Sequence, residues 1–235
     1  MTNDTPSPAP IADVPVVLAI DIGGSHVKIM VSSGGDERKA VSGPDMTATA
    51  MVEAVKTMAD GLSYDVVTMG FPGPVAHGRI ITEPHNLGAG WVGFDFAGAF
   101  GKPLRIVNDA LMQAAGSYDG GRMLFLGLGT GLGAAMIVDN VAQPMELAHL
   151  PYRKGKTFED YVGEASLKKR GRKKWAKYVF DVIDRLSQAM EPDYVVLGGG
   201  NAEKLDAFPA NVRLGDNANA FKGGFRVWHD KTLLI

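Results

Sequence analysis

Two glycine-rich turns are the parts of this sequence best suited to hold a phosphate group. At the first, an apolar run ends in Asp21, breaks at Gly23 and Gly24, and resumes as a second apolar run. This pattern predicts a strand, a tight turn and a second strand. Adjacent glycines allow positive φ and leave backbone N–H groups uncovered, which suits phosphate, and Asp21 could hold a cation or its water. The alternative is an ordinary hairpin with a surface aspartate.

The second turn is the segment GLGTGLG, residues 127–133, which carries four glycines at alternate positions. It matches neither the G-x-G-x-x-G loop nor the Walker loop. Alternate glycines suit a hairpin turn whose backbone presses against a phosphate chain, and Thr130 adds a hydroxyl. A crowded hairpin packed against another strand would need the same glycines, so both interpretations stay open.

Asp109 stands where an apolar strand gives way to a helix of small residues. A carboxylate at this point can cap the helix, which is its commoner role. It can also act as a general base that accepts a proton from an attacking hydroxyl. Phosphoryl transfer requires little else of a protein than positioned reactants, neutralised phosphates and one base. Lys28, just after the first turn, could assist with its positive charge.

A few polar residues are suited to binding a sugar. Glu146 and His149 are three residues apart, so both can face one side of a turn and hold sugar hydroxyls or a metal. Asn86 can donate to and accept from a hydroxyl. Trp91 could form a pocket wall or fill the core. A Glu/His pair also occurs by chance on surfaces, so the pair alone is weak evidence.

The second half of the sequence repeats features of the first in the same order. The two glycine turns, the segments YDVVTMGFPG and PDYVVLGGG, and the segments around Asp109 and Asp216 are separated by about 106, 128 and 108 residues. Three similarities in one order indicate two homologous halves. Hairpins followed by alternating helices and strands predict an α/β fold with a binding cleft between the halves. The alternative is one larger sheet without a functional duplication.

These observations divide the chain into three parts. Residues 1–15, rich in Pro, Ser and Thr, are expected to be a disordered lead-in. Residues 16–107 and 108–235 are the two predicted halves. Long helices are expected around residues 51–59 and over residues 175–190, where apolar side chains recur at helical spacing.

Composition excludes several classes of protein. The chain has 235 residues, a net charge of −2 and no cysteine, which rules out disulfides and thiolate chemistry. No apolar stretch is long enough to span a membrane, and the N-terminus has no signal-peptide pattern. We therefore expect a cytoplasmic protein with no membrane partner.

One segment is strongly basic. Between Arg153 and Lys177 there are ten Lys or Arg residues and three acidic ones, a local charge of +7. Such a segment in an otherwise acidic chain predicts a polyanion site, and a solvated helix face or flexible loop is the alternative. Nucleic acid is not expected, because no aromatic residues alternate with the charges. The predicted polyanion patch is Lys168, Lys169, Arg170 and Arg172.

Taken together, DIGGSHVK, GFPGPV, IVNDA, GLGTGLGAA, ELAHL and VVLGGG resemble, in order, the ROK family of sugar kinases, and most closely its polyphosphate-glucokinase-like branch. The resemblance implies the actin-like/hexokinase fold of two ribonuclease H-like halves. It implies transfer of a phosphoryl group from polyphosphate, ATP or both to the 6-hydroxyl of glucose or a related hexose, with Mg²⁺. It also suggests a homodimer.

The resemblance assigns a role to each matching position. Asp109 matches the catalytic base, and Asp21 is the expected Mg²⁺ ligand. The positions that match sugar contacts are Gly73, Asn86, Asn108, Glu146 and His149. Those that match the phosphate and donor segments are Asp21, Gly23, Gly24, Ser25, Lys28, Gly129, Thr130, Gly131, Gly199 and Gly200.

Three features depart from the family pattern. Ala148 replaces a glycine between Glu146 and His149, where its methyl group could shift the sugar. The zinc-binding cysteines of many members are missing, so no zinc is expected. The chain is short after Gly200, which could abbreviate the adenine pocket. A non-catalytic sensor of sugar or polyphosphate is therefore the alternative function.

Overall fold

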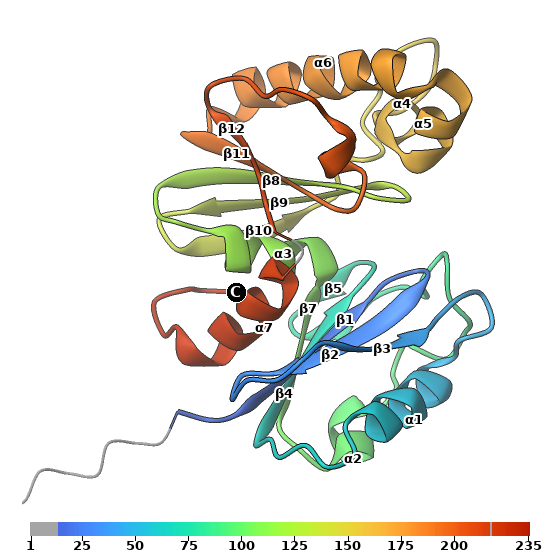
Figure 1. Cartoon of the computed structure of the whole chain (residues 1–235), viewed down its shortest axis with the longest axis vertical. Helices are drawn as coiled ribbons and strands as arrows, with labels where there is room; N and C mark the ends of the chain where they lie inside the picture. The colour runs from blue at the N-terminus through green and yellow to red at the C-terminus, as the bar shows by residue number, and fades with distance from the viewer. Residues whose placement is uncertain (1–13, 217) are drawn as a thin grey trace, which may run out of the picture.

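The computed structural model describes residues 14–216 and 218–235. The predicted lead-in, residues 1–15, thus lies almost wholly outside the described residues. The fold is α/β, with two five-stranded sheets stacked along the long axis of the molecule (Figure 1). None of the helices in the described ranges is both long and apolar enough to cross a bilayer.

The first sheet has the strand order β3-β2-β1-β4-β7. Its first three strands form antiparallel hairpins, whereas β4 pairs with β1 and β7 in parallel. All six residues of β4 are buried, as expected of a central parallel strand. The strands are β1 (Val17–Ile22), β2 (His26–Val31), β3 (Arg38–Val41), β4 (Val66–Phe71) and β7 (Leu104–Asn108).

The second sheet repeats this order as β10-β9-β8-β11-β12, with the same alternation of antiparallel and parallel pairs. Each strand therefore has a counterpart in the first sheet, as the internal sequence repeat predicts. A two-stranded ribbon, β5 (Val75–Ala76) with β6 (Arg79–Ile80), extends the first half. The second-sheet strands are β8 (Arg122–Leu128), β9 (Leu132–Val138), β10 (Val141–Met145), β11 (Tyr194–Gly198) and β12 (Val212–Leu214).

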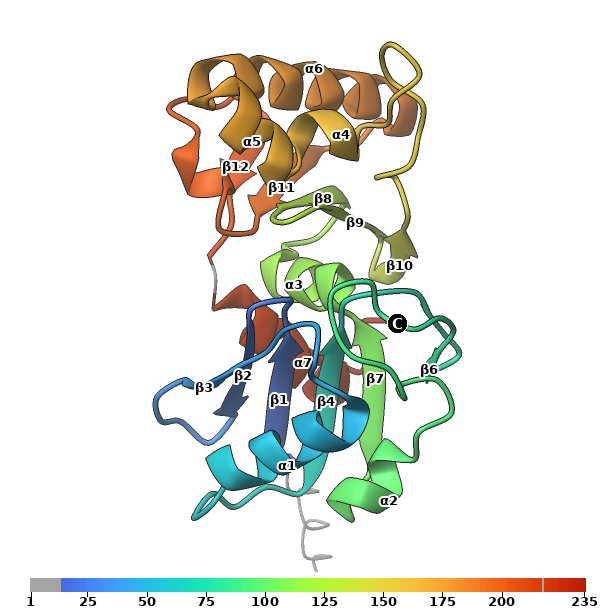
Figure 2. The same cartoon turned by 90° about the vertical axis from the view of Figure 1, so that its right-hand side faces the viewer.

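Helices cover the outer face of each sheet (Figure 2). On the first sheet these are α1 (Ala48–Met58), which starts where the Thr47 hydroxyl accepts from the N–H of Ala50 at 3.2 Å, and α2 (Phe96–Phe100). On the second sheet they are α4 (Glu159–Val162), α5 (Glu164–Arg170) and α6 (Arg172–Met190), with the short helix η1 (Ala202–Lys204) nearby. The predicted helix over residues 175–190 begins three residues earlier, just after Gly171 at φ 76°.

Two helices lie between the sheets, and each follows a strand of one sheet but packs on the other sheet (Figure 1). Helix α3 (Asp109–Ser117) follows β7 of the first sheet but packs on β9, β10 and β8 of the second. Helix α7 (Asn219–His229) follows the second sheet but packs on β1 and β4 of the first. The Thr68 hydroxyl in β4 donates to the carbonyl of Gly224 at 2.7 Å. The two sheets are thus joined by exchanged helices.

The crossing of α3 and α7 depends on glycine. A Cβ placed on Gly116 would overlap the carbonyl oxygen of Asn219, and one on Gly223 would overlap that of Met112. The side chain of Asn219 then donates to the Ser117 hydroxyl at 3.0 Å in a buried position. Both glycines lie in the segments that the sequence repeat paired, so the repeated motif forms the contact between the helices.

Replacing Gly223 with alanine should lower the free energy of unfolding by about 2 kcal/mol or more, because the added methyl group forces α3 and α7 apart. This loss exceeds the gain of about 1 kcal/mol in helix propensity. Chemical denaturation measures the change. The neighbouring variant Lys222→Ala, at an exposed position of the same helix, is the control. A Gly223→Ala protein as stable as the control would contradict the close crossing.

Candidate active site

The first glycine turn links β1 to β2, with Asp21 opposite Lys28 in the strand register. The N–H of Gly23 donates to the carbonyl of His26 at 2.9 Å, and the Ser42 hydroxyl donates to the carbonyl of Gly23 at 2.6 Å. Gly24 and Ser25 are exposed at the tip. The turn therefore leaves its outermost residues open to a ligand.

The expectation that Gly23 and Gly24 take positive φ is wrong, since neither lies in the left-handed region. Close approach explains these glycines instead. A Cβ on Gly23 would lie 3.2 Å from the carbonyl oxygen of His26, and one on Gly24 would lie 3.4 Å from the Cβ of Asn86. The turn is thus brought against the loop that carries a predicted sugar ligand.

Three neighbouring elements hold the second glycine turn, between β8 and β9. The carboxylate of Glu159 accepts from the N–H of Leu132 at 3.1 Å and occupies the space that a Cβ on Gly131 would need. The N–H of Glu164 and the side-chain amide of Asn201 donate to the carbonyl of Gly129 at 3.2 and 3.0 Å. Within the described chain, no protein acceptor receives the N–H groups of Thr130 or Gly131, which remain available to an anion.

A third glycine segment lies against this turn. Gly199 has φ 80°, and a Cβ there would lie 2.5 Å from the carbonyl oxygen of Leu128. Gly200 has open space where its side chain would be. Asn201 donates from its backbone to Leu128 as well as from its amide to Gly129. Sequence reasoning missed the role of Asn201, whose only signal was its place directly after three glycines.

The sequence left two roles open at Asp109, helix cap and general base. The structure gives the capping role to the preceding residue, Asn108. Asn108 is the N-cap of α3, because its Oδ1 accepts from the N–H of Leu111 at 3.0 Å. Its Nδ2 donates to the carbonyl of Gly73 at 3.2 Å, so the buried amide ties the GFPG loop to the helix. Asp109 is the first helical residue, and its Oδ1 accepts from the N–H of Ala110 at 2.8 Å.

The start of α3 lies between the two glycine turns. Burial raises the pKa of Asp109, and negative charge on Asp21, at the first turn, raises it further. A Cβ on Gly133, just after the second turn, would lie 2.9 Å from the Cβ of Ala110. Both turns therefore lie near the start of α3, and we refer to the segments 23–25 and 129–131 as the phosphate clamp.

The electrostatics of this region disfavour a further negative charge. Burial raises the pKa of Asp109 to about 7, with contributions from Asp21 and Glu146, against the N–H of Ala110. Burial also raises the pKa of Asp21, although Lys28 opposes the shift. Lys28 is itself paired with Glu37 at 3.6 Å. The charges of Asp21 and Glu146 thus act on the carboxyl group of Asp109 and favour its protonated form.

The other predicted sugar contacts surround this region to different degrees. Asn86 is exposed beside Gly24, and Glu146 is exposed in the loop after β10 but close enough to Asp109 to influence its pKa. His149 is exposed in the same loop. A Cβ on Gly73 would lie 2.8 Å from the ring of Phe71.

Ala148 and Trp91 both belong to the core. Ala148 is 3% exposed among the apolar side chains of the second half, and its φ is not in the left-handed region that would require glycine. Trp91 is fully buried, with ring centroids 5.5 Å from Phe71 and 6.0 Å from Phe96. Of the two roles considered for Trp91, pocket wall and core, the structure therefore shows the second.

Most of the predicted polyanion patch is engaged with the protein. Lys168 pairs with Glu164 at 2.9 Å, and Arg170 donates to the Ser166 hydroxyl at 3.0 Å while its guanidinium lies over Tyr161. Arg172 bonds to Asp206 and to the carbonyl of Lys204. Lys169 is exposed.

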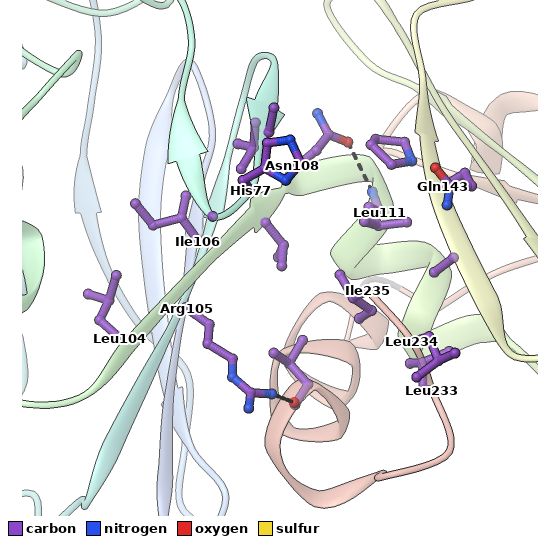
Figure 3. A pocket seen from close by; sticks show the side chains of 17 residues that line it. His77, Leu104, Arg105, Ile106, Asn108, Leu111, Gln143, Leu233, Leu234 and Ile235 are labelled. Carbon is purple, nitrogen blue, oxygen red and sulfur yellow. Dashed lines mark hydrogen bonds between the residues drawn. The ribbon is translucent and has the colours of Figure 1, made fainter.

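A cavity of about 850 Å³ lies on another side of the α3 start, between β7, β10 and residues 233–235 (Figure 3). Arg105 donates across its floor to the carbonyl of Val227 in α7, and Asn108 caps α3 at its upper end. Apart from Asn108, the cavity contains none of the predicted site residues. It is therefore separate from the phosphate clamp.

Two glycine turns of matching halves that face an aspartate at a helix start define the class of the protein. The sequence model of the ROK family matches residues 17–144, more than half of the chain, and the chain belongs to this family. The fold is the actin-like/hexokinase fold.

Individual relatives agree with this assignment. Polyphosphate glucokinase of Mycobacterium tuberculosis is 30% identical over 209 residues, which cover 80% of this chain and 78% of that protein. The polyphosphate/ATP-glucomannokinase of Arthrobacter sp. strain KM superposes with a TM-score of 0.77 at 22% identity, over 91% of this chain and 97% of that one. A ROK family glucokinase of Streptomyces griseus, solved with glucose and AMPPNP, gives a TM-score of 0.74 at 15% identity, over 91% and 99%. The chain is a phosphotransferase.

The raised pKa of Asp109 predicts a pH-dependent gain in stability for Asp109→Asn. Because the folded-state pKa is about 7 and the ordinary value is 3.8, the ionised carboxylate destabilises the folded state progressively as pH rises from about 4 to 7. Asparagine avoids this cost, so the variant should be more stable than the wild type by about 2 kcal/mol at pH 8. The two proteins should have nearly equal stability near pH 4.

Denaturant titrations at both pH values measure the difference. Asp45→Asn, which removes a carboxylate from an exposed position, is the control. A stability difference between Asp109→Asn and wild type that is the same at pH 4 and pH 8 would contradict a buried, perturbed carboxyl group.

Proposed function

We propose that the protein transfers a phosphoryl group from polyphosphate, ATP or both to the 6-hydroxyl of glucose or a related hexose, with Asp109 as general base. The observation that carries this proposal is the position of Asp109 at the start of α3, between the two halves of the phosphate clamp. The names of the Mycobacterium tuberculosis relative and of the structurally similar glucomannokinase support both the sugar and the donors.

The base has the properties that the reaction needs. With a pKa of about 7, Asp109 is partly ionised at neutral pH and is basic enough to accept a hydroxyl proton as the new bond forms. In the proposed step the sugar oxygen forms a bond to phosphorus, its proton passes to Asp109, and the bond from phosphorus to the leaving phosphate or ADP oxygen breaks. Placement of the sugar hydroxyl would fall to Asn86, Glu146 and His149.

Asn108 takes a different part in this proposal. Its side-chain amide is committed to Leu111 and Gly73, so it would act by fixing the GFPG loop and the start of α3. A change at Asn108 would therefore alter the position of Asp109 as well as any direct contact with the sugar.

The donor phosphates would lie on the phosphate clamp. The N–H groups of Thr130 and Gly131 and the exposed tip at Gly24 and Ser25 offer backbone donors without bulky side chains. Gly199 and Gly200 lie next to the second turn and would border the distal part of the donor.

A magnesium ion fits this arrangement if phosphate supplies most of its ligands. Among the described residues no group of three or more potential metal ligands is gathered. Mg²⁺ at phosphoryl-transfer sites is commonly bound by one or two carboxylates, substrate oxygens and waters. Asp21, beside Asp109 and at the first turn, would be its protein ligand, and the ion would neutralise charge on the transferred group.

Asp109→Asn should reduce turnover of glucose with either donor by a factor of about 100 or more, because the hydroxyl proton then has no acceptor. Glucose binding should largely persist, since asparagine keeps the size and the hydrogen-bonding capacity of the side chain. Glucose 6-phosphate formation with Mg²⁺ and each donor measures the first effect, and calorimetry with glucose measures the second.

The same assay separates the enzyme from a non-catalytic sensor. No glucose 6-phosphate from any donor in folded wild-type protein, together with sugar binding that Asp109→Asn leaves unchanged, would favour the sensor. The wild type should be assayed with a matrix of hexoses and donors, which also identifies the preferred pair.

The polyanion patch makes a prediction about the donor. Replacing Lys168 and Lys169 with glutamine should raise KM for polyphosphate, of short and long chains alike, more than KM for ATP, because α5 begins beside the second turn. These two lysines are chosen because Arg170 and Arg172 also hold structure. Equal effects on polyphosphate and ATP would reject the patch as a donor site.

A further inference from the structure

A second basic site lies on the outer layer of the second half, away from the clamp. Helix α6 and the loop over residues 151–157 enclose a cavity of about 480 Å³. Figure 2 shows this loop rising beside α6. We call this cavity the α6 pocket; its lining residues are Arg153, Lys173, Lys174, Lys177, Tyr178 and Asp181.

The one acidic residue of the α6 pocket is already engaged. The Asp181 carboxylate accepts from the Tyr152 hydroxyl at 2.6 Å and from Nε of Arg185 at 2.8 Å, and it pairs with Arg153 at 3.3 Å. Hydrogen bonds from Tyr152 and Arg185 hold the pKa of Asp181 below its ordinary value. Its negative charge is therefore shared between two arginines and does not neutralise the lysines.

The three lysines of the pocket have no protein partner of their own. Lys173, Lys174 and Lys177 are exposed, and no hydrogen bond or ion pair joins their ammonium groups to the described part of the chain. Residues three and four apart share one side of a helix, so Lys177 lies near both others and the like charges repel. An anion bound among them would remove this repulsion.

The aromatic rings beside the pocket argue against a nucleobase. The Arg153 guanidinium lies over the rings of Tyr152 and Tyr178, at 4.9 and 5.8 Å from their centroids. Arg170 lies over Tyr161 at 4.5 Å and over Tyr178 at 5.2 Å. Because arginines already stack on these rings, the pocket presents positive charge rather than a free ring for stacking. A phosphate-rich chain without bases fits this surface best.

Helix α5 connects the α6 pocket with the phosphate clamp. It starts where the N–H of Glu164 donates to the carbonyl of Thr130 at 3.1 Å, and its seven residues span about 10 Å. Gly171, at φ 76°, then turns the chain into α6, whose first two turns carry the lysines. Only an extended ligand can reach from the clamp to the pocket.

We propose that the α6 pocket is a second binding site for inorganic polyphosphate, which holds one stretch of the chain while a terminal phosphate lies in the clamp. This inference rests on the proposed function, in which polyphosphate is a donor. The pocket would favour long chains over short ones, because a short chain or ATP cannot occupy both sites. No group is transferred at the pocket.

The test compares two triple variants of the full chain. Lys173→Gln with Lys174→Gln and Lys177→Gln should raise KM for long-chain polyphosphate about tenfold, as expected for the loss of three lysine–phosphate contacts. Its kcat, and its KM for tetraphosphate and ATP, should match the wild type. The control, Lys39→Gln with Lys56→Gln and Lys231→Gln, removes the same charge from exposed positions elsewhere and should leave every KM unchanged.

A rise in KM that is equal for long-chain polyphosphate, tetraphosphate and ATP would overturn the proposal, and so would an equal rise in the control variant. Anisotropy of labelled long-chain polyphosphate, without sugar, measures binding independently of transfer. Absence of transfer from every donor would refute the proposed function. In that case, weaker binding of long-chain polyphosphate by the pocket variant than by the control variant would still support the α6 pocket as a polyphosphate site. Equal binding by the two variants would refute it.

Discussion

Helices α3 and α7 cross between the two sheets at a distance that only glycine allows, at Gly116 and Gly223. Each helix follows one half in sequence and packs on the other, so the crossing fixes both sheets relative to one another. It also fixes the start of α3, where Asp109 lies. If larger residues stood at Gly116 and Gly223, the helices would lie further apart and the carboxyl group of Asp109 would have a different position relative to the glycine turns. The candidate site therefore depends on a helix crossing that lies outside the site itself.

The site itself gathers negative charge in a place where burial opposes it. Asp21, Asp109 and Glu146 come from β1, α3 and the loop after β10, and the pKa values of the two aspartates are raised. A protein that only had to be stable would gain by replacing one of them. In the proposed function, a donor phosphate with its cation would change this balance and would use the N–H groups of Thr130 and Gly131, which have no protein acceptor within the described chain.

The positively charged side chains in the outer layer of the second half fall into two groups. Arg153, Arg170 and Arg185 are stacked on tyrosines or bonded to Asp181 or Ser166, and they give the outer layer of the second half its shape. The lysines of α6 lie beside this arrangement, and none of them pairs with a side chain of the described residues. Arginine suits the first role because its planar group stacks and forms several hydrogen bonds, whereas lysine remains a mobile point charge. The basic segment thus contains a structural part and a part that is free to bind anions.

The sequence by itself determined the family, the α/β repeat, both glycine turns and the place of Asp109 at a helix start. These features follow from local patterns, since strand alternation, helical spacing and turn residues are set by near neighbours. Only the tertiary structure decided that Asn108 caps the helix, that Gly23 and Gly24 serve close approach rather than positive φ, and that Ala148 belongs to the core. It also decided which basic residues stay free. Several of these outcomes depend on atoms far apart in the chain, such as Gly24 beside Asn86 or Asp206 beside Arg172, and no local pattern records such pairs.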